Sequence, residues 1–258
     1  MLEIEHILSN SKSISAESAI KSIIEIGNRM GPDEGESFVQ KNEELLRFQV
    51  AAYKHYEKYL LDSESIASNR LLEANIKDID AFNFLTGFGK DAYERVNDMF
   101  NHVNFDSCRR FVLVGCGSLP ATIFNVHKRT KVKEIVGVDN RGEAIDTFQK
   151  IIDKFEFKNM QAVCCSGQSF DYQGTDIVYI ANLVSPKHEV IDQVLETASP
   201  DIQVIVREPY SVGRLWTESL TSNLDERLEV VALGEFVPAY YSRDIIVQRK
   251  AANERAEV

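Results

Sequence analysis

The spacing of apolar residues changes near residue 105. Before that point, apolar residues recur at helical intervals. The stretch SAESAIKSIIEIGNRM begins with Ser15 in a position to cap a helix, and it places four isoleucines on roughly one face: Ile20, Ile23, Ile24 and Ile26. The later stretch NEELLRFQVAAYKHYEKYLLDSESIASNRLLEANI keeps helical spacing for several turns. The pattern predicts an N-terminal helical cap over residues 1–105.

Short apolar runs alternate with helical segments in the rest of the chain. The runs are RFVLVG, EIVGVD, MQAVCC, DIVYIANL, DIQVIVRE, EVVALGEF and DIIVQR. Continuous apolar strands separated by amphipathic helices indicate a mostly parallel sheet with helices on both faces. Because no helical pattern separates the last two runs, we expect a C-terminal antiparallel hairpin. Residues 106–258 are therefore predicted to form an α/β domain of the class I methyltransferase-like, Rossmann-type fold.

Composition excludes several classes of protein. With 258 residues, of which 44% are hydrophobic, the chain can bury a full core. No apolar run approaches the roughly 20 residues that span a bilayer, and the start MLEIEHILSN lacks the features of a secretory signal, so we expect a cytoplasmic protein with no membrane partner. The net charge of −11 and scattered Lys and Arg argue against nucleic acid and favour a small-molecule substrate. A homodimer is compatible with the sequence.

The four cysteines do not indicate a metal site or a disulfide framework. They form no CxxC pair, and no histidine lies at metal-ligand spacing from them. We expect no metal. Cys164 and Cys165 end an apolar run and are most simply two buried small hydrophobic residues.

A glycine turn follows the first predicted strand, in FVLVGCGSLPATIF. Gly115 and Gly117 let the backbone approach a ligand closely, and the helix that follows offers unpaired N–H groups to a pyrophosphate or to an amino-acid carboxylate. Pro120 stands where a dinucleotide fingerprint needs a small residue, which favours S-adenosylmethionine over NAD. We count Cys116, between the two glycines, among the residues that bind the cofactor.

An acidic residue ends the next predicted strand, EIVGVDN. Asp139 lies 22 residues after Gly117, where a carboxylate accepts hydrogen bonds from ribose hydroxyls; Asn140 follows it. After the third strand, the Gln168 amide is suited to the adenine edge, which both donates and accepts. The alternatives are that the glycines only make a tight turn, that Asp139 caps a helix and that Gln168 is an ordinary loop residue.

These segments resemble the nicotianamine synthases and related bacterial metallophore synthases. VLVGCGSLPATIF is similar to their GSGPLPLT turn, and the matching positions are Gly115, Gly117, Leu119, Pro120 and Thr122. The resemblance extends to EIVGVDNRGEAID, DIVYIANLVSPK and DIIVQRK, and covers about the last 150 residues. It implies an enzyme that binds S-adenosylmethionine, uses its 3-amino-3-carboxypropyl arm instead of its methyl group and releases methylthioadenosine.

The resemblance also points to residues of the helical cap. ESIASNRLLE is similar to the segment where these synthases carry an essential glutamate, which maps to Glu64; the alternative is a solvated helix residue. The aromatic patch of the family corresponds to AFNFLTGFGK, but Lys90, or Phe88 in a shifted alignment, stands in place of its tyrosine. That departure argues against transfer to a bulky second amine.

Tyr179 and Asn182 end the strand DIVYIANL, at the sheet edge where open α/β sheets bind ligands. A tyrosine face stabilises a sulfonium by cation–π attraction, and an asparagine carbonyl can face an ammonium. The Tyr-x-x-Asn pattern resembles a second branch, the azetidine-2-carboxylate synthases, which close a ring within S-adenosylmethionine. The alternatives are that Tyr179 packs in the core and that Asn182 caps a loop.

Other side chains near this edge each have more than one possible role. Arg207 is a candidate for binding the substrate carboxylate, but it could equally pair with Glu208 or lie on the surface. Tyr240 and Tyr241 in the terminal hairpin could roof the pocket, although aromatic residues at such bends more often serve packing.

The sequence supports four functions in decreasing order. The first is cyclisation of S-adenosylmethionine to azetidine-2-carboxylic acid, with Tyr179, Asn182 and Glu64 as catalytic residues. The second is transfer of the same aminobutyryl group to an amino-acid amine, as in nicotianamine or opine-metallophore synthesis, which needs acidic groups under the cap. The third is ordinary methyl transfer, and the fourth is a binding or sensor protein.

Overall fold

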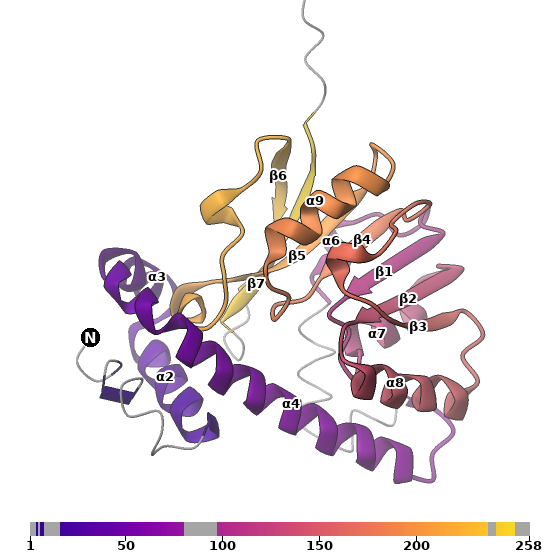
Figure 1. Ribbon diagram of the computed structural model, residues 1–258, viewed down its shortest axis with the longest axis horizontal. Helices are drawn as coiled ribbons and strands as arrows, with labels where there is room; N and C mark the ends of the chain where they lie inside the picture. The colour runs from indigo at the N-terminus through magenta and orange to yellow at the C-terminus, as the bar shows by residue number, and fades with distance from the viewer. Residues whose placement is uncertain (1–3, 5, 8–15, 80–96, 237–240, 251–258) are drawn as a thin grey trace, which may run out of the picture.

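The computed structural model describes residues 4, 6–7, 16–79, 97–236 and 241–250 of the chain (Figure 1). N-terminal helices lie beside a mixed α/β body in this view. No helix among the described residues is long and apolar enough to cross a membrane.

A mixed sheet of seven strands forms the centre of the body, in the order β3-β2-β1-β4-β5-β7-β6. The first five strands pair in parallel, and β7 runs antiparallel to β5 on one side and to β6 on the other. The strands are β1 Arg110–Val114, β2 Glu134–Asp139, β3 Met160–Cys164, β4 Ile177–Ile180, β5 Gln203–Pro209, β6 Leu228–Leu233 and β7 Ser242–Arg249. Every apolar run expected to be a strand is one, and the predicted terminal hairpin is confirmed.

Helices cover both faces of the sheet, because the central strands are apolar on both sides. Phe124 of α7 (Ala121–Arg129) and Phe148 of α8 (Gly142–Phe155) share one buried cluster with Leu113. The helix α9 (Lys187–Thr197) covers the opposite face and packs with Val112 and Val178. Short helical turns complete this part: α6 Met99–His102, η3 Gly167–Ser169, η4 Ser211–Leu215 and η5 Thr221–Asn223. The predicted class I methyltransferase-like α/β fold is confirmed.

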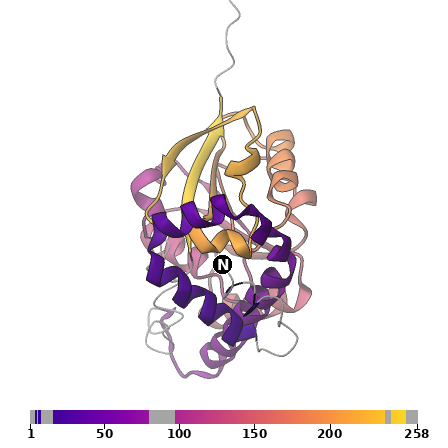
Figure 2. The ribbon, with the colours of Figure 1, turned by 90° about the vertical axis from the view of Figure 1, so that its left-hand side faces the viewer.

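The N-terminal helices pack against the carboxyl-terminal half of the chain. They are α2 Ala16–Met30, α3 Pro32–Lys41, η1 Glu43–Phe48 and α4 Gln49–Glu73. Tyr56 of α4 stacks on Trp216 at a ring-centroid distance of 5.1 Å, and Trp216 meets Tyr241 edge to face. Figure 2 shows these helices in front of the sheet. The helical cap therefore shares an apolar cluster with the α/β part, while the division at residues 1–105 and 106–258 stays a prediction.

The helix α4 connects the two buried regions. With 25 residues it is about 38 Å long. Its first half packs in the cap cluster through Ala52 and Leu60, and its last turns enter the main core through Ala67 and Leu71. The Lys154 ammonium, in the last turn of α8, donates to three carbonyl oxygens at the α4 C-terminus, with Nζ–O distances of 2.6 to 2.9 Å: Leu71, Leu72 and Ala74. These contacts fix α4 to α8.

The structure corrects the prediction for the paired cysteines and decides between the two interpretations of Tyr241. Cys164 is exposed and Cys165 is only partly buried, so the prediction of two buried cysteines is wrong. The reason is that β3 is an edge strand, whose side chains are less covered. Tyr241 is 2% exposed inside the cap cluster and does not line the cavity described below, so it serves packing. Tyr240 lies outside the described residues.

Candidate active site

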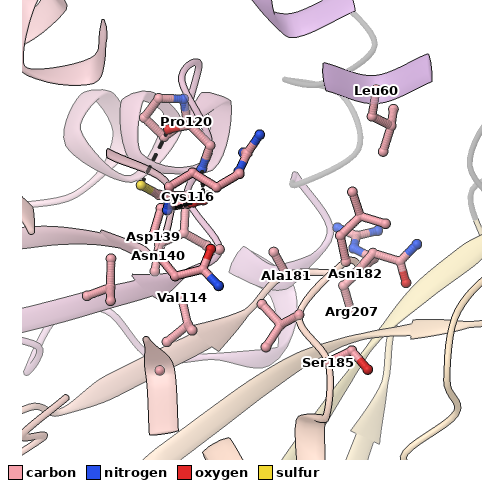
Figure 3. Close-up of a pocket in the computed structure, with 18 of the residues that line it drawn as sticks. Leu60, Val114, Cys116, Pro120, Asp139, Asn140, Ala181, Asn182, Ser185 and Arg207 are labelled. Atoms are coloured by element: carbon pink, nitrogen blue, oxygen red, sulfur yellow. Dashed lines mark hydrogen bonds and ion pairs between the residues drawn. The ribbon is translucent and has the colours of Figure 1, made fainter. Parts of the chain in front are cut away.

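A cavity of about 230 Å³ opens between the carboxyl ends of the parallel strands and the helix α4 (Figure 3). Asp139 and Asn140 lie on one flank in this view, and Asn182 and Arg207 lie on the other. All the predicted site residues line it: Glu64, Gly115, Cys116, Gly117, Asp139, Asn140, Gln168, Tyr179, Asn182 and Arg207. The fold thus gathers these residues from the carboxyl ends of five strands, β1 to β5, and from one helix of the cap.

The glycine turn forms one wall of the cavity. Gly115 and Gly117 have φ angles of +73° and +67°, in the left-handed region that favours glycine. The Gly115 and Cys116 N–H groups donate to the Val138 carbonyl at 2.8 and 3.1 Å, and the Gly117 N–H donates to Asp139 Oδ2 at 2.9 Å. The turn is therefore tied to the end of β2, and these three N–H groups already have partners.

Asp139 is the acidic residue at the end of β2. Its Oδ1 accepts hydrogen bonds from the Arg141 backbone N–H at 3.0 Å and from Arg141 Nε at 3.2 Å. Each carboxylate oxygen can accept more than one hydrogen bond, so the group can still receive a ribose hydroxyl. Asn140 lies beside Asp139 in Figure 3, and Gln168 lines the cavity after β3, the neighbour of β2; both fit the predicted adenosine end of the site.

One face of α4 forms the opposite wall, and most of it escaped the sequence analysis. Its residues lie at helical spacing: Tyr53, Tyr56, Glu57, Leu60, Leu61 and Glu64. The Tyr53 hydroxyl contacts the Leu183 carbonyl at 3.2 Å and Glu57 Oε1 at 3.3 Å. Burial, together with Glu57, raises the pKa of Tyr53 to about 12. The periodic mixture of aromatic and acidic residues was the signal that could have revealed this wall.

Glu64 lies directly against the glycine turn. A Cβ atom added at Gly117 would sit 2.5 Å from Glu64 Oε2 and 3.1 Å from its Cδ. Such a distance is shorter than real Cβ contacts allow, so the absence of a side chain at position 117 makes room for the carboxylate. The structure therefore has the Glu64 side chain pointing into the cavity instead of into solvent.

Cys116 is held as a thiol beneath the turn. It is 4% exposed, and its Sγ donates to the Gly117 carbonyl at 3.5 Å. Burial raises the pKa of the Cys116 thiol well above its ordinary value, with Asp139 and Glu64 adding to the effect. Because the thiolate is the nucleophilic form, Cys116 is unsuited to nucleophilic catalysis.

A buried ion pair between Arg207 of β5 and Asp244 of β7 lies beside Tyr179 of β4. Arg207 Nε lies 2.9 Å from Asp244 Oδ1, and the Tyr179 hydroxyl donates to the same oxygen at 2.7 Å. Arg207 also donates to the Tyr179 hydroxyl, at 2.9 and 2.7 Å from Nε and an η nitrogen. Burial opposes the charged guanidinium, but Asp244 and Tyr179 raise the pKa of Arg207 above its ordinary value. The group stays a cation.

Two sequence-based alternatives for Arg207 are wrong. At 4% exposure Arg207 is not a surface residue, and its ion-pair partner is Asp244 instead of Glu208. The Glu208 carboxylate accepts hydrogen bonds from Ser219 Oγ and from the Leu220 N–H. Sheet register explains the outcome, because Arg207 is directly opposite Asp244 in the antiparallel β5–β7 pair.

A buried lysine at the start of α9 binds the loop that follows β4. Lys187, with no exposed surface, donates from Nζ to the Asn182 carbonyl at 2.9 Å and to the Glu218 carbonyl at 3.1 Å. Burial lowers the pKa of Lys187 to about 8, although Glu208 and Glu218 oppose this shift. The Asn182 side chain accepts a hydrogen bond at Oδ1 from the Thr217 hydroxyl at 3.2 Å. Backbone and side chain of Asn182 are thus both oriented.

Two further predictions concern an aromatic patch and the absence of a metal. Lys90 and Phe88 are the two alternative positions for the missing tyrosine of the aromatic patch in the resembled synthases, and both lie outside the described residues. Within the described ranges, no group of three or more His, Cys, Asp or Glu side chains is arranged to hold a metal ion.

Comparison with known proteins gives a structural likeness only. No protein-family model and no curated protein matches the chain. A Glu-to-Gln variant of the nicotianamine synthase MtNAS in complex with S-adenosylmethionine is 12% identical, with a TM-score of 0.81 over 96% of this chain and 97% of that chain. MtNAS in complex with MTA and tNA is 13% identical, with a TM-score of 0.82 and the same coverage. The chain thus has the fold of these nicotianamine synthase structures over nearly its whole length, helical cap included.

Proposed function

We propose that the protein is an enzyme that consumes S-adenosylmethionine by breaking the bond between sulfur and the γ-carbon of the 3-amino-3-carboxypropyl arm. An amine nitrogen attacks this carbon opposite the sulfur, the electron pair of the broken bond goes to sulfur, and methylthioadenosine leaves as a neutral thioether. The observation that carries the proposal is the Glu64 carboxylate, which faces the glycine turn from the cap. The likeness to MtNAS in complex with S-adenosylmethionine and with MTA supports the same reading.

Glu64 acts as the proton acceptor in this proposal. A protonated amine has no lone pair, so the nucleophile must lose a proton before or during attack. A carboxylate inside the cavity both attracts the ammonium form and accepts that proton. Tyr179 offers its ring to the sulfonium by cation–π attraction, as the sequence suggested. Asp139 and Asn140, on the opposite flank from Asn182 and Arg207, hold the adenosine end together with Gln168.

We further propose that the attacking amine belongs to S-adenosylmethionine itself. Its nitrogen bonds to its own γ-carbon, closes a four-membered ring and yields azetidine-2-carboxylic acid, methylthioadenosine and one proton. The cavity volume of about 230 Å³ is just below the roughly 300 to 1,000 Å³ of most small-molecule sites, which favours one bound substrate over two. Catalysis then consists mainly of folding the arm so that nitrogen and γ-carbon meet.

A second candidate, transfer to an amino-acid amine, has its own supporting observation. Glu57 and Glu64 line the cavity from the same face of α4, seven residues and about 10 Å apart. Two carboxylates at this separation suit two ammonium groups, one from each substrate. Under this reading Glu57 receives the acceptor amine, and MtNAS in complex with MTA and tNA offers a parallel.

Product analysis separates these functions. The purified protein is incubated with S-adenosylmethionine alone, and methylthioadenosine, azetidine-2-carboxylate and S-adenosylhomocysteine are quantified by mass spectrometry. A no-enzyme sample corrects for spontaneous decomposition of the substrate. We expect equal amounts of methylthioadenosine and azetidine-2-carboxylate. Turnover that begins only when histidine or another amine is added supports the second candidate. Formation of S-adenosylhomocysteine refutes both and indicates methyl transfer.

A further inference from the structure

Two buried polar atoms on one flank of the cavity have no hydrogen-bond partner in the described part of the chain. They are Ser242 Oγ and Asn182 Nδ2. Ser242 is 1% exposed, and both residues line the cavity. Buried polar groups in folded proteins nearly always have partners, so an unpartnered pair that lines a cavity calls for an explanation, and a ligand bound in that cavity is one that fits.

Sheet register and the view in Figure 3 place Ser242 and Asn182 on the same side of the site as Arg207. In the β5–β7 pair, Ser242 is opposite Pro209, and Asp244 is opposite Arg207. Ser242 is therefore the diagonal neighbour of Arg207, and the backbone positions of such neighbours are about 7 to 8 Å apart. Residues two apart share a face of the sheet, which places Ser242 on the same side as Asp244 and Arg207. Asn182 and Arg207 lie on the same flank of the cavity in Figure 3. Three strands thus converge on one corner.

The Asn182 amide presents a donor to this corner. Its Oδ1 already accepts the Thr217 hydroxyl hydrogen, and its Nδ2 carries the two N–H groups that lack a partner. The sequence had suggested that the amide oxygen faces an ammonium; the hydrogen bond to Thr217 favours the opposite polarity. A hydroxyl, an amide NH₂ and a guanidinium are together donors, and their common ligand is an oxyanion.

The glycine turn is less suited to the same anion. The N–H groups of Gly115, Cys116 and Gly117 are all engaged by protein acceptors. The Glu64 carboxylate beside Gly117 also repels a second negative charge. A carboxylate in the cavity is therefore better accommodated at the corner of Asn182, Arg207 and Ser242 than at the turn.

We propose that Ser242, Asn182 and Arg207 form a subsite for the α-carboxylate of the 3-amino-3-carboxypropyl arm, and this proposal rests on the function proposed above. The arm is then a zwitterion held at both ends, with its carboxylate at this corner and its ammonium toward Glu64. This orientation brings the nitrogen to the proton acceptor. Ser242 and Thr217 gain roles that the sequence did not indicate: Ser242 binds the carboxylate, and Thr217 fixes the amide that binds it.

The subsite is tested by binding calorimetry with three ligands that cannot be turned over. S-adenosylhomocysteine keeps the arm but lacks the sulfonium, its decarboxylated analogue lacks only the carboxylate, and methylthioadenosine lacks the arm. We expect the unmodified protein to bind S-adenosylhomocysteine about tenfold or more tightly than the decarboxylated analogue, as charge-assisted hydrogen bonds predict. Ser242→Ala and Asn182→Asp should remove most of this difference and leave methylthioadenosine binding unchanged. Gln248→Ala, at an exposed position on the same strand β7, serves as the control. It should keep the difference in affinity between S-adenosylhomocysteine and its decarboxylated analogue.

The outcomes distinguish this subsite from the proposed function. Equal affinities of the unmodified protein for S-adenosylhomocysteine and its decarboxylated analogue overturn the subsite, even if the protein makes methylthioadenosine. If none of the three ligands binds to the unmodified protein, the proposed function is refuted instead. If the variants raise only the KM of an added acceptor amino acid, the corner binds the acceptor carboxylate and the assignment is wrong. Ser242→Ala should melt no lower than the unmodified protein, because the hydroxyl that it removes has no protein partner.

Discussion

The Glu64 carboxylate lies directly against Gly117, although Glu64 comes from the helical cap and Gly117 from the first turn of the α/β part. The space that the missing side chain of Gly117 leaves is filled by the Glu64 carboxylate, 2.5 Å from where a Cβ would lie. The glycine therefore has two roles, since its φ of +67° also needs a residue without a side chain.

Gly117→Ala should abolish binding of S-adenosylmethionine and its analogues. The methyl group displaces the Glu64 carboxylate, and the left-handed backbone adds strain of about 1 to 2 kcal/mol. Gly174→Ala is the matched control, because Gly174 has a φ of +73° but nothing within 4 Å of its added Cβ. Both variants should lose similar stability in thermal unfolding, and only Gly117→Ala should lose ligand binding in calorimetry. Equal binding by both variants would show that contact with Glu64 is unimportant.

Glu64→Gln should stop turnover while ligand binding persists. The amide has nearly the shape of the carboxylate but cannot accept a proton from the attacking amine. We expect a loss of roughly 10²- to 10⁴-fold in the rate of methylthioadenosine release, the usual contribution of a general base. Affinity for methylthioadenosine, which has no amine on an arm, should stay within a few fold. Full activity of this variant would remove Glu64 from the mechanism.

Tyr179 lines the cavity, and its hydroxyl belongs to the buried Arg207–Asp244 cluster. Tyr179→Phe keeps the ring, so the cation–π hypothesis predicts nearly unchanged kcat. Loss of a hydrogen bond to a charged group should lower the free energy of unfolding by roughly 1.5 to 3 kcal/mol. Tyr179→Leu removes the ring and should lower kcat about tenfold. If the two variants have the same kcat at saturating substrate, the ring does not stabilise the sulfonium.

The sequence revealed those parts of the molecule that depend on local pattern. The strands are continuous apolar runs, and Asp139 follows one of them at a fixed distance from the glycine turn, so both could be predicted. The Arg207–Asp244 pair could not, because it joins residues 37 positions apart through the antiparallel pairing of β5 with β7. The burial of Ser242 depends on the same pairing. The cavity face of α4 was missed because helical spacing shows which residues share a face but not what that face meets.

Lys154 holds the C-terminal end of α4, the helix that carries Glu64, and we expect it to help position the Glu64 carboxylate. Its ammonium binds three carbonyl oxygens at the C-terminus of α4, where the helix dipole also favours a cation. Lys154→Met should lower the free energy of unfolding by roughly 1 to 3 kcal/mol and should lower kcat more than it raises KM, because α4 carries Glu64. Lys154→Arg should keep part of the stability and part of the kcat that Lys154→Met loses. Lys150→Met, at an exposed position on the same helix, should change neither the free energy of unfolding nor kcat. A loss of stability with unchanged kcat would limit Lys154 to a structural role.

Lys187 should make the stability of the fold rise between about pH 8 and pH 10.5. Its pKa is about 8 in the folded protein and near 10.5 when exposed, because burial disfavours the ammonium. Below pH 8 both states carry the charge, and the folded state bears the full cost of burying it. As the pH rises through 8, the folded state releases a proton that the unfolded state keeps, so the folded state gains stability.

The comparison with Lys187→Met isolates this effect from other titrating groups. Between pH 7.5 and 9.5 the free energy of unfolding of the unmodified protein should increase relative to the variant by about 2 kcal/mol, as a shift of this size implies. Urea unfolding at both pH values gives the four free energies that are needed. A difference between the two proteins that does not change with pH would mean that Lys187 keeps an ordinary pKa. In that case the ammonium is stabilised by more than its two carbonyl acceptors and the carboxylates of Glu208 and Glu218.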